Sequence, residues 1–317
     1  MGLDIRRDIV DPVHRQPELV AVWLLLALIG VAIFATYLRL PADELYGVSG
    51  TGLAAGASRV VVFLGFPVSL IALATVPIAY AMTASAGRRR AAAVVSFASF
   101  ALCMTIAIPG VLEEKDLDAK WVNAPAVVGV ALALALTVWA LRADGPAAPP
   151  WGRADTVRVA VAGALLVASV PWLAAELGFY LPGDVFLTGQ IRPFAGETGS
   201  GLGPAVHFGD HHGLSGVELA LAAIALLRVV PRLPGARRRL LVNVYLSVML
   251  VYGLANGVQD FWLEQVVKRG WTDARMPSLL RPELSPAWAA MLATAAAFFL
   301  VVRASGARAS RPAIITE

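Results

Sequence analysis

The sequence has little charge, and it holds one cysteine and few histidines. Charged residues make up 15% of its 317 residues, and hydrophobic ones make up 58%. About a quarter of a typical soluble chain is charged, so this chain cannot cover a water-soluble surface, and its excess apolar surface is expected to face lipid. The single cysteine, Cys103, lies inside an apolar run and excludes an intrachain disulfide.

Missing residues also exclude several kinds of site. The chain has four histidines, which are too few for a di-iron site of the membrane desaturase kind, and the first half lacks ligands for a haem held between helices. The glycine-rich stretch at residues 196–203 is followed by no Gly-Lys-Ser/Thr sequence, so it does not predict a phosphate-binding loop. The net charge of +4 does not indicate nucleic acid, because the basic residues flank apolar runs.

What the chain has in abundance is long apolar runs. Its mean hydropathy is +0.71, and several runs of about 17 to 25 residues are long enough to cross a hydrocarbon core of about 30 Å. We therefore predict an all-α integral membrane protein with about eight transmembrane helices. The predicted helices are residues 19–40, 60–82, 91–112, 124–141, 157–177, 214–230, 240–260 and 286–302.

Arginine residues crowd alternate connections between these runs. They occur in the leader, at residues 88–90, 142–158 and 228–239, and in the tail after residue 302. Basic residues favour the cytoplasmic side, so we predict that these connections and both termini are cytoplasmic. The long connections at residues 178–213 and 261–285 would then face outward. The alanine- and arginine-rich composition is typical of a high-GC bacterial genome, which predicts a bacterial plasma membrane.

A linker rich in proline and glycine, residues 142–155, divides the chain into halves of residues 1–145 and 146–317. Each half is predicted to hold four helices. Short matches recur in the same order in both halves, for example LPAD at residues 40–43 and LPGD at 181–184. This pattern favours duplication of a four-helix unit. The alternative is that any two arginine-flanked, alanine-rich regions share such fragments. In either case a cleft between the halves is the expected place for a site.

Ionisable residues within the apolar runs are the first candidates for function, because burying them in lipid costs free energy. They concentrate in the second half, at Glu218, Glu176 and Asp260, which we predict to be catalytic, whereas the first half resembles a scaffold. If their helix faces meet in one outward-opening pocket, these carboxyl groups could act as acids and bases near neutral pH. The alternative is that they cap helix ends or lie among lipid headgroups.

The wall of this pocket is expected to be aromatic and polar. Trp172 lies one helical turn from Glu176, and Tyr252 and Asn256 lie two turns and one turn before Asp260, so each set shares a helix face. Aromatic rings beside an acid could stabilise a carbocation, whereas an aromatic belt at the membrane interface is the alternative. The predicted substrate-binding residues are Trp172, Tyr180, Phe208, Tyr252, Asn256 and Trp262.

Three of the histidines, His207, His211 and His212, lie just before the sixth apolar run. If this stretch is helical, His207 and His211 are one turn apart, a spacing that lets two imidazoles bind one metal ion. Asp210 or a nearby glutamate could complete the site, although Gly209 favours a turn instead. A divalent metal such as zinc is therefore a candidate cofactor, while the leading function requires none.

These features predict a multi-pass membrane enzyme that acts on a lipophilic small molecule by acid-base chemistry, for example proton-initiated isoprenoid cyclisation. One alternative is a metal-dependent membrane hydrolase that uses His207, His211 and His212. A small-molecule transporter and a non-catalytic subunit of a membrane complex are the others. The ionisable groups cluster at one end of the helices rather than along a path through the midplane, which favours the enzyme. The expected partners are the lipid bilayer and a lipophilic small molecule, without nucleic acid, and no oligomeric state is indicated.

Overall fold

The computed structural model describes residues 16–46, 49–83, 89–108, 111, 118–143, 150–183, 185–191, 203–280 and 282–309. The prediction of an all-α fold is confirmed, since helices dominate this part of the chain. The α-helices are α2 (Pro17–Arg39), α3 (Gly52–Phe63), α4 (Ser69–Thr83), α5 (Arg89–Cys103), α6 (Ala124–Leu141), α7 (Arg153–Ala168), α8 (Val170–Glu176), α9 (His212–Leu227), α10 (Ala236–Trp262) and α11 (Pro286–Ala309). Strands β1 (Gln190–Ile191) and β2 (Gly203–Pro204) pair antiparallel.

Six helical segments of the described chain are long and apolar enough to cross a membrane, which supports the class of membrane protein. The pair α7 and α8 forms a seventh candidate if the two helices act as one bent span, and α9 is an apolar helix of 16 residues. The count of eight spans and the duplication stay predictions. The predicted boundary between residues 145 and 146, like the arginines of the leader, lies outside the described residues.

Short turns of other geometry change several predicted helix ends. The helix predicted at residues 60–82 is two helices: α3 begins at Gly52, and α4 follows the segment η1 (Leu64–Val68), inside which Phe66 is extended with φ −157° and ψ 127°. The π-helical turn η5 (Leu263–Val267) continues α10 beyond its predicted end at residue 260. The helix predicted to reach residue 112 ends with the 3₁₀ turn η2 (Met104–Ala107), because Ile108 precedes a proline and is extended. Two further 3₁₀ turns are η3 (Trp121–Asn123) and η4 (Val230–Arg232).

The helix predicted at residues 157–177 is broken into α7 and α8, which meet at 54°. Pro171 lies at this bend. A proline lacks an N–H donor, and its ring clashes with the carbonyl group four residues earlier, so a straight helix is disfavoured there. The bend places α8 against α2 and α9. Glu176, the last residue of α8, is thereby buried inside the bundle.

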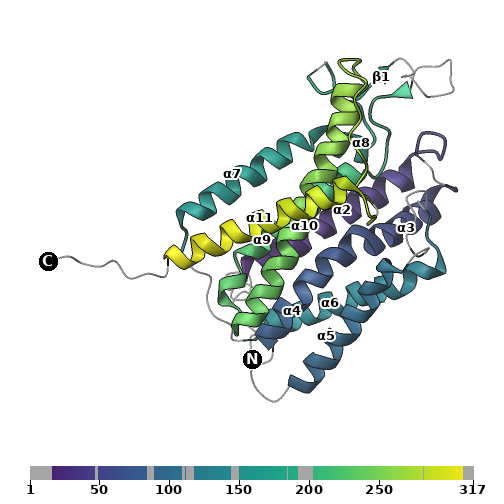
Figure 1. The fold of residues 1–317 in the computed structure, drawn as a ribbon. Helices are drawn as coiled ribbons and strands as arrows, with labels where there is room; N and C mark the ends of the chain where they lie inside the picture. Colours follow the sequence, from purple (N-terminus) through teal and green to yellow (C-terminus); the bar gives the residue numbers. More distant parts are fainter. Residues whose placement is uncertain are drawn as a thin grey trace, which may run out of the picture.

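Helix α9 lies at the centre of the bundle, where it contacts α2, α4, α7, α8 and α10 (Figure 1). Most of its residues are buried, as expected of a helix that is apolar on all sides. In Figure 1, strand β1 lies beyond the end of α10 and near α8. The N-terminus of α9 and the C-termini of α8 and α10 therefore share this end of the molecule.

Glycine residues allow α9 and α10 to approach closely. A Cβ atom on Gly216 would lie 2.6 Å from the Gly253 carbonyl oxygen and 2.9 Å from the Gly257 nitrogen. Gly253 and Gly257 are four residues apart, the small-residue spacing that lets helix backbones pack in membranes. This contact sets the position of α9, which carries Glu218, against α10, which carries Asp260.

An ionic network ties the helices at the opposite end of the bundle. Arg228 forms an ion pair with Glu18, and its Nε lies 3.0 Å from Asp155 Oδ1. Arg232 Nη2 lies 2.7 Å from Glu18 Oε2, and Arg158 Nη1 lies 2.7 Å from Asp155 Oδ1. The arginines of this network belong to connections that the sequence predicts to be cytoplasmic.

Candidate functional site: an acid cavity and a histidine-carboxylate cluster

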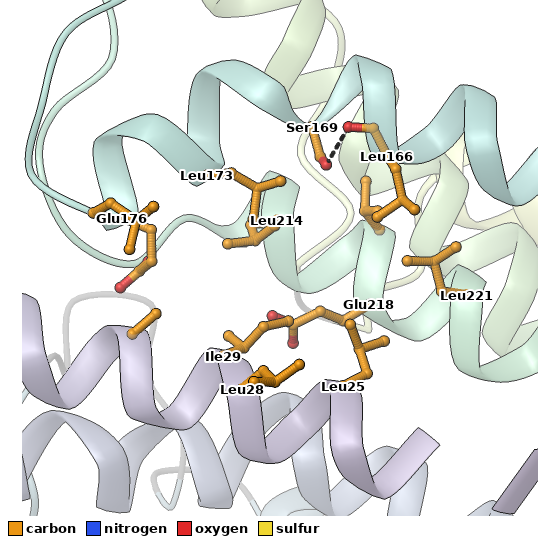
Figure 2. A pocket seen from close by; sticks show the side chains of 13 residues that line it. Leu25, Leu28, Ile29, Leu166, Ser169, Leu173, Glu176, Leu214, Glu218 and Leu221 are labelled. Atoms are coloured by element: carbon orange, nitrogen blue, oxygen red, sulfur yellow. Dashed lines mark hydrogen bonds between the residues drawn. The ribbon is translucent and has the colours of Figure 1, made fainter. Parts of the chain in front are cut away.

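Glu176 and Glu218 face one cavity of about 220 Å³ between α2, the α7/α8 pair and α9, which we call the acid cavity. Figure 2 shows both carboxyl groups on the side of the cavity nearest α2, with Glu218 beside Ile29. Each glutamate is 1% exposed. Neither carboxyl group has a hydrogen-bond partner in the described part of the chain. The rest of the lining is aliphatic except for Ser169, which lies between α7 and α8 and donates its hydroxyl to the Leu166 carbonyl oxygen of α7.

The acid cavity opens at the flank of the bundle rather than at the helix ends. Leu28, Leu166 and Leu177 line it and are 68%, 45% and 48% exposed. Exposed leucines on the sides of membrane helices face hydrocarbon. The cavity is therefore open toward the flank of the bundle that these leucines form.

A buried ion pair lies near the acid cavity. Arg59 Nη2 donates to Asp210 Oδ2 at 2.7 Å, and the two side chains are 6% and 7% exposed. The Tyr37 hydroxyl accepts a hydrogen bond from the Asp210 backbone N–H at 3.1 Å. Arg59 and Asp210 act electrostatically on Glu176, whereas the charges that act on Glu218 are those of Asp210 and Glu176. Burial is the largest effect on both glutamates, and of the two only Glu176 has an arginine among the groups that act on it.

Asp260, the third predicted catalytic residue, lies away from the acid cavity in a group with His211, His212 and Glu264, which we call the histidine-carboxylate cluster. His212 Nε2 lies 3.1 Å from Asp260 Oδ1. His211 Nδ1 lies 4.0 Å from Asp260 Oδ2 and 3.7 Å from Glu264 Oε1. His211, Asp260 and Glu264 are buried. The structure therefore separates the predicted acids into two groups.

His207 Nδ1 lies 3.1 Å from the Phe208 carbonyl oxygen, and the group of closely spaced ligand atoms consists of His211, Asp260 and Glu264 without His207. Residues 207–211 are not helical, and α9 begins at His212, so the expected one-turn spacing of His207 and His211 does not occur. Gly209 has a φ of 100°, and a Cβ atom there would collide with the Tyr37 hydroxyl, so this turn requires glycine. The His207 ring stacks on the His211 ring at 4.0 Å. Burial lowers the pKa of His207 well below its usual range and also lowers the pKa of His211.

The six predicted substrate-binding residues are dispersed, and the acid cavity has an aliphatic lining in their place. The Tyr180 and Phe208 rings stack on each other at 4.3 Å. The Tyr252 hydroxyl donates to the Leu280 carbonyl oxygen at 3.1 Å, and Asn256 Nδ2 donates to the Tyr252 carbonyl oxygen at 2.9 Å. None of these four residues lines the acid cavity, and Asn256 Oδ1 is buried without a hydrogen-bond partner in the described chain.

The two predicted tryptophans line a second cavity of about 270 Å³ between the α7/α8 pair, α9 and α10. Trp172 Nε1 donates to Glu264 Oε2 at 2.7 Å, so this residue contacts the histidine-carboxylate cluster. Trp262 Nε1 donates to the Ala274 carbonyl oxygen at 2.7 Å. The second cavity has no ionisable residue in its lining, so it has no side chain that could act as an acid or a base.

Sequence reasoning missed two residues of these groups, Arg59 and Glu264. Arg59 adjoins an apolar run, and a charged residue inside a membrane helix is a functional candidate, but the helix was predicted to begin one residue later. Glu264 follows Asp260 by four residues and continues the helix face that Asp260 occupies. It was missed because the predicted helix ended at residue 260.

Comparison with protein families, curated proteins and solved structures finds no match to this chain. The basis for a functional proposal is therefore the chemistry of the two groups. The acid cavity offers paired carboxyl groups in an apolar space open at the flank. The histidine-carboxylate cluster offers nitrogen and oxygen atoms that point toward one another near the ends of the helices.

Proposed function

We propose that the protein is a multi-pass membrane enzyme that acts on a lipophilic small molecule by acid-base chemistry in the acid cavity. The observation that carries this proposal is that Glu176 and Glu218 face the same cavity, buried and without hydrogen-bond partners in the described chain. Leaving such a polar group unpaired costs about 1–3 kcal/mol. A purely structural role would not require two unpaired carboxyl groups in one lipid-side cavity, because each lowers the stability of the fold. Buried ionisable groups of this kind concentrate at functional sites.

The surroundings of the two carboxyl groups suggest separate roles. Burial disfavours the charged form of both carboxyl groups, and Asp210 adds to this effect on both. Arg59 opposes the effect at Glu176, whereas Glu218 has a further carboxyl group, Glu176, acting on it. Glu176 is thus the one of the two that loses its proton more readily, so we assign Glu218 as the proton donor and Glu176 as the base. The proposed step is proton transfer from Glu218 to an alkene carbon, followed by loss of a proton from a neighbouring carbon to Glu176.

This step describes isomerisation or cyclisation of an isoprenoid chain, with no net change in the atoms of the substrate. One carbon gains a proton, and another carbon loses one. A second proton transfer, from Glu176 to Glu218 through solvent or substrate, restores the starting state. Because the cavity wall is aliphatic, a cationic intermediate would be stabilised chiefly by the Glu176 carboxylate rather than by aromatic rings.

The test uses deuterium as a label. Purified protein in lipid nanodiscs is incubated in D₂O with linear isoprenoids and unsaturated lipids, and the products are measured by mass spectrometry. Wild type is expected to exchange one hydrogen of the substrate for deuterium, and Glu218→Gln is expected to lose this activity. Glu283→Gln is the matched control, because Glu283 is exposed and does not line the acid cavity. Equal unfolding temperatures for all three proteins would confirm that the variants fold.

Either of two results would refute the proposal. One is exchange by Glu218→Gln at the wild-type rate. The other combines two negative findings. No lipophile offered shows deuterium exchange, and every lipophile that copurifies with wild type also copurifies with Ala32→Phe, a variant in which the cavity is filled.

The predicted topology belongs to the same proposal: eight spans, cytoplasmic termini and a bacterial plasma membrane. Cysteine labelling tests the orientation, because Cys103 is buried and can be replaced by alanine to give a background without cysteine. Val185 and Trp151 are 86% and 64% exposed and lie at opposite ends of the bundle. A membrane-impermeant maleimide should label Val185→Cys in intact cells and Trp151→Cys only after permeabilisation. The reverse pattern would refute the orientation.

A further inference from the structure

The geometry points to a divalent metal site in the histidine-carboxylate cluster: we propose that His211, Asp260 and Glu264 bind one transition-metal ion, with zinc as the first candidate. This ion would join the segment before α9 to the end of α10. The site is separate from the acid cavity, and the inference does not depend on the proposed acid-base reaction. It also differs from the three-histidine site that the sequence predicts.

The three residues present ligand atoms within 4.8 Å of one another, and all three are buried. The His211 Nδ1 atom lies 4.0 Å from Asp260 Oδ2 and 3.7 Å from Glu264 Oε1. Both distances are too long for hydrogen bonds. Two ligand atoms bound tetrahedrally to zinc at about 2.0–2.1 Å are separated by about 3.3 Å. Small side-chain rotations would bring the three atoms to that separation.

The orientation of the His211 ring is the second observation. Its Nε2 atom lies 2.7 Å from the His207 carbonyl oxygen. A carbonyl oxygen only accepts hydrogen bonds, so Nε2 carries a hydrogen, and in the neutral ring Nδ1 presents its lone pair to the two carboxylates. A lone pair that faces two anions is unfavourable unless a cation lies between them. A histidine whose other ring nitrogen donates to a backbone carbonyl is the arrangement found at protein metal sites.

Both carboxylates are also held in place by hydrogen bonds. Trp172 Nε1 donates to Glu264 Oε2 at 2.7 Å, and Oε1 of the same carboxylate is the atom that faces His211. The Gly213 backbone N–H donates to Asp260 Oδ2 at 3.0 Å. Such bonds fix ligand orientation before a metal binds. Glu264 lies in the π-helical turn η5, and π-helical turns in α-helices often occur at functional sites.

The charges around the cluster are compatible with a divalent ion. Two buried carboxylates are costly unless positive charge lies beside them. His212 Nε2 lies 3.1 Å from Asp260 Oδ1, and Lys268, whose Nζ donates to the Ala205 carbonyl oxygen, acts electrostatically on Glu264. A divalent cation held by His211 would contact both carboxylates directly. Its mixed imidazole and carboxylate ligands suit zinc, iron(II) or manganese(II), and zinc should bind more tightly than manganese(II).

The test titrates zinc alone into protein made without a histidine tag and stripped with a chelator. Calorimetry should show about one zinc ion per chain, and the unfolding temperature should rise with zinc concentration. Glu264→Gln should weaken zinc binding by about 100-fold. Glutamine is isosteric and still accepts from Trp172, so the unfolding temperature without zinc should stay near the wild-type value.

His207→Ala is the matched control, because His207 stacks on His211 but contributes no ligand atom to the group. This variant should bind zinc nearly as tightly as wild type. Three results would overturn the inference: no zinc binding by wild type, wild-type affinity in Glu264→Gln, or loss of binding in His207→Ala with binding retained in Glu264→Gln. The last result would place the metal on the histidines instead.

Discussion

The contact between α9 and α10 makes a sharp prediction about two glycines of the same helix. A Cβ atom on Gly253 would collide with the Gly216 carbonyl oxygen and would lie 2.9 Å from the Ala220 nitrogen. A Cβ atom on Gly257 would meet its nearest neighbours, the Gly213 carbonyl oxygen and the Val217 side chain, at 3.6 Å. The first contact requires the helices to move apart, whereas the second is an ordinary van der Waals distance.

The expected magnitudes follow from these distances. Both Gly253→Ala and Gly257→Ala gain about 0.8–1 kcal/mol in helix propensity. Gly253→Ala also incurs an overpacking cost of about 1–3 kcal/mol, since backbone atoms cannot rotate away. The free energy of unfolding should therefore be lower for Gly253→Ala than for Gly257→Ala by about 1–3 kcal/mol.

The assay is reversible unfolding of both variants in the same lipid bicelles, with wild type as the reference. Gly257→Ala should match or exceed the stability of wild type. If Gly253→Ala proved as stable as Gly257→Ala, the close approach of α9 and α10 would be wrong, and with it the placement of Glu218 relative to Asp260.

Two further predictions concern buried polar contacts. Arg59→Met should reduce the free energy of unfolding by about 3–5 kcal/mol, because Asp210 loses its buried partner. Adding Asp210→Leu should restore part of this loss in the same unfolding assay. If the double variant showed no recovery, the pairing of Arg59 with Asp210 would be contradicted. Trp172→Phe should cost about 1–3 kcal/mol, because it leaves a buried oxygen of Glu264 without its partner. Trp262→Phe loses an exposed hydrogen bond to the Ala274 carbonyl oxygen and should cost about 1 kcal/mol or less. Equal costs would argue against a buried hydrogen bond between Trp172 and Glu264.

Apolar runs predicted where the helices lie, because the length and composition of a run decide whether a segment can be buried in lipid as a helix. Each of the eight predicted runs overlaps a helix of the structure. Local breaks were harder to predict. Pro171 was visible in the sequence, but prolines occur in other helices without a separate bent segment, as Pro77 does in α4. Packing around α8 decides that the chain turns there.

The grouping of the acids could not be predicted from spacing along single helices. Glu176 and Glu218 come together because α8 and α9 pack on each other and on α2. Asp260 shares a helix face with Tyr252 and Asn256, but the neighbours of α10 differ along its length, so the three side chains meet different partners. Residues on a shared helix face point their side chains in the same direction. Tertiary packing decides which residues of other helices those side chains contact.

Helix α8 connects the two groups. Trp172 donates to Glu264 of the histidine-carboxylate cluster, and Glu176, four residues later, faces the acid cavity. The bend at Pro171 sets the position of both side chains. Pro171→Ala permits a straight helix, so it should weaken zinc binding and reduce deuterium exchange together, whereas Glu264→Gln and Glu218→Gln should each impair one. Titration and exchange measured on the same preparations test this, and loss of only one activity in Pro171→Ala would show that α8 does not position both groups.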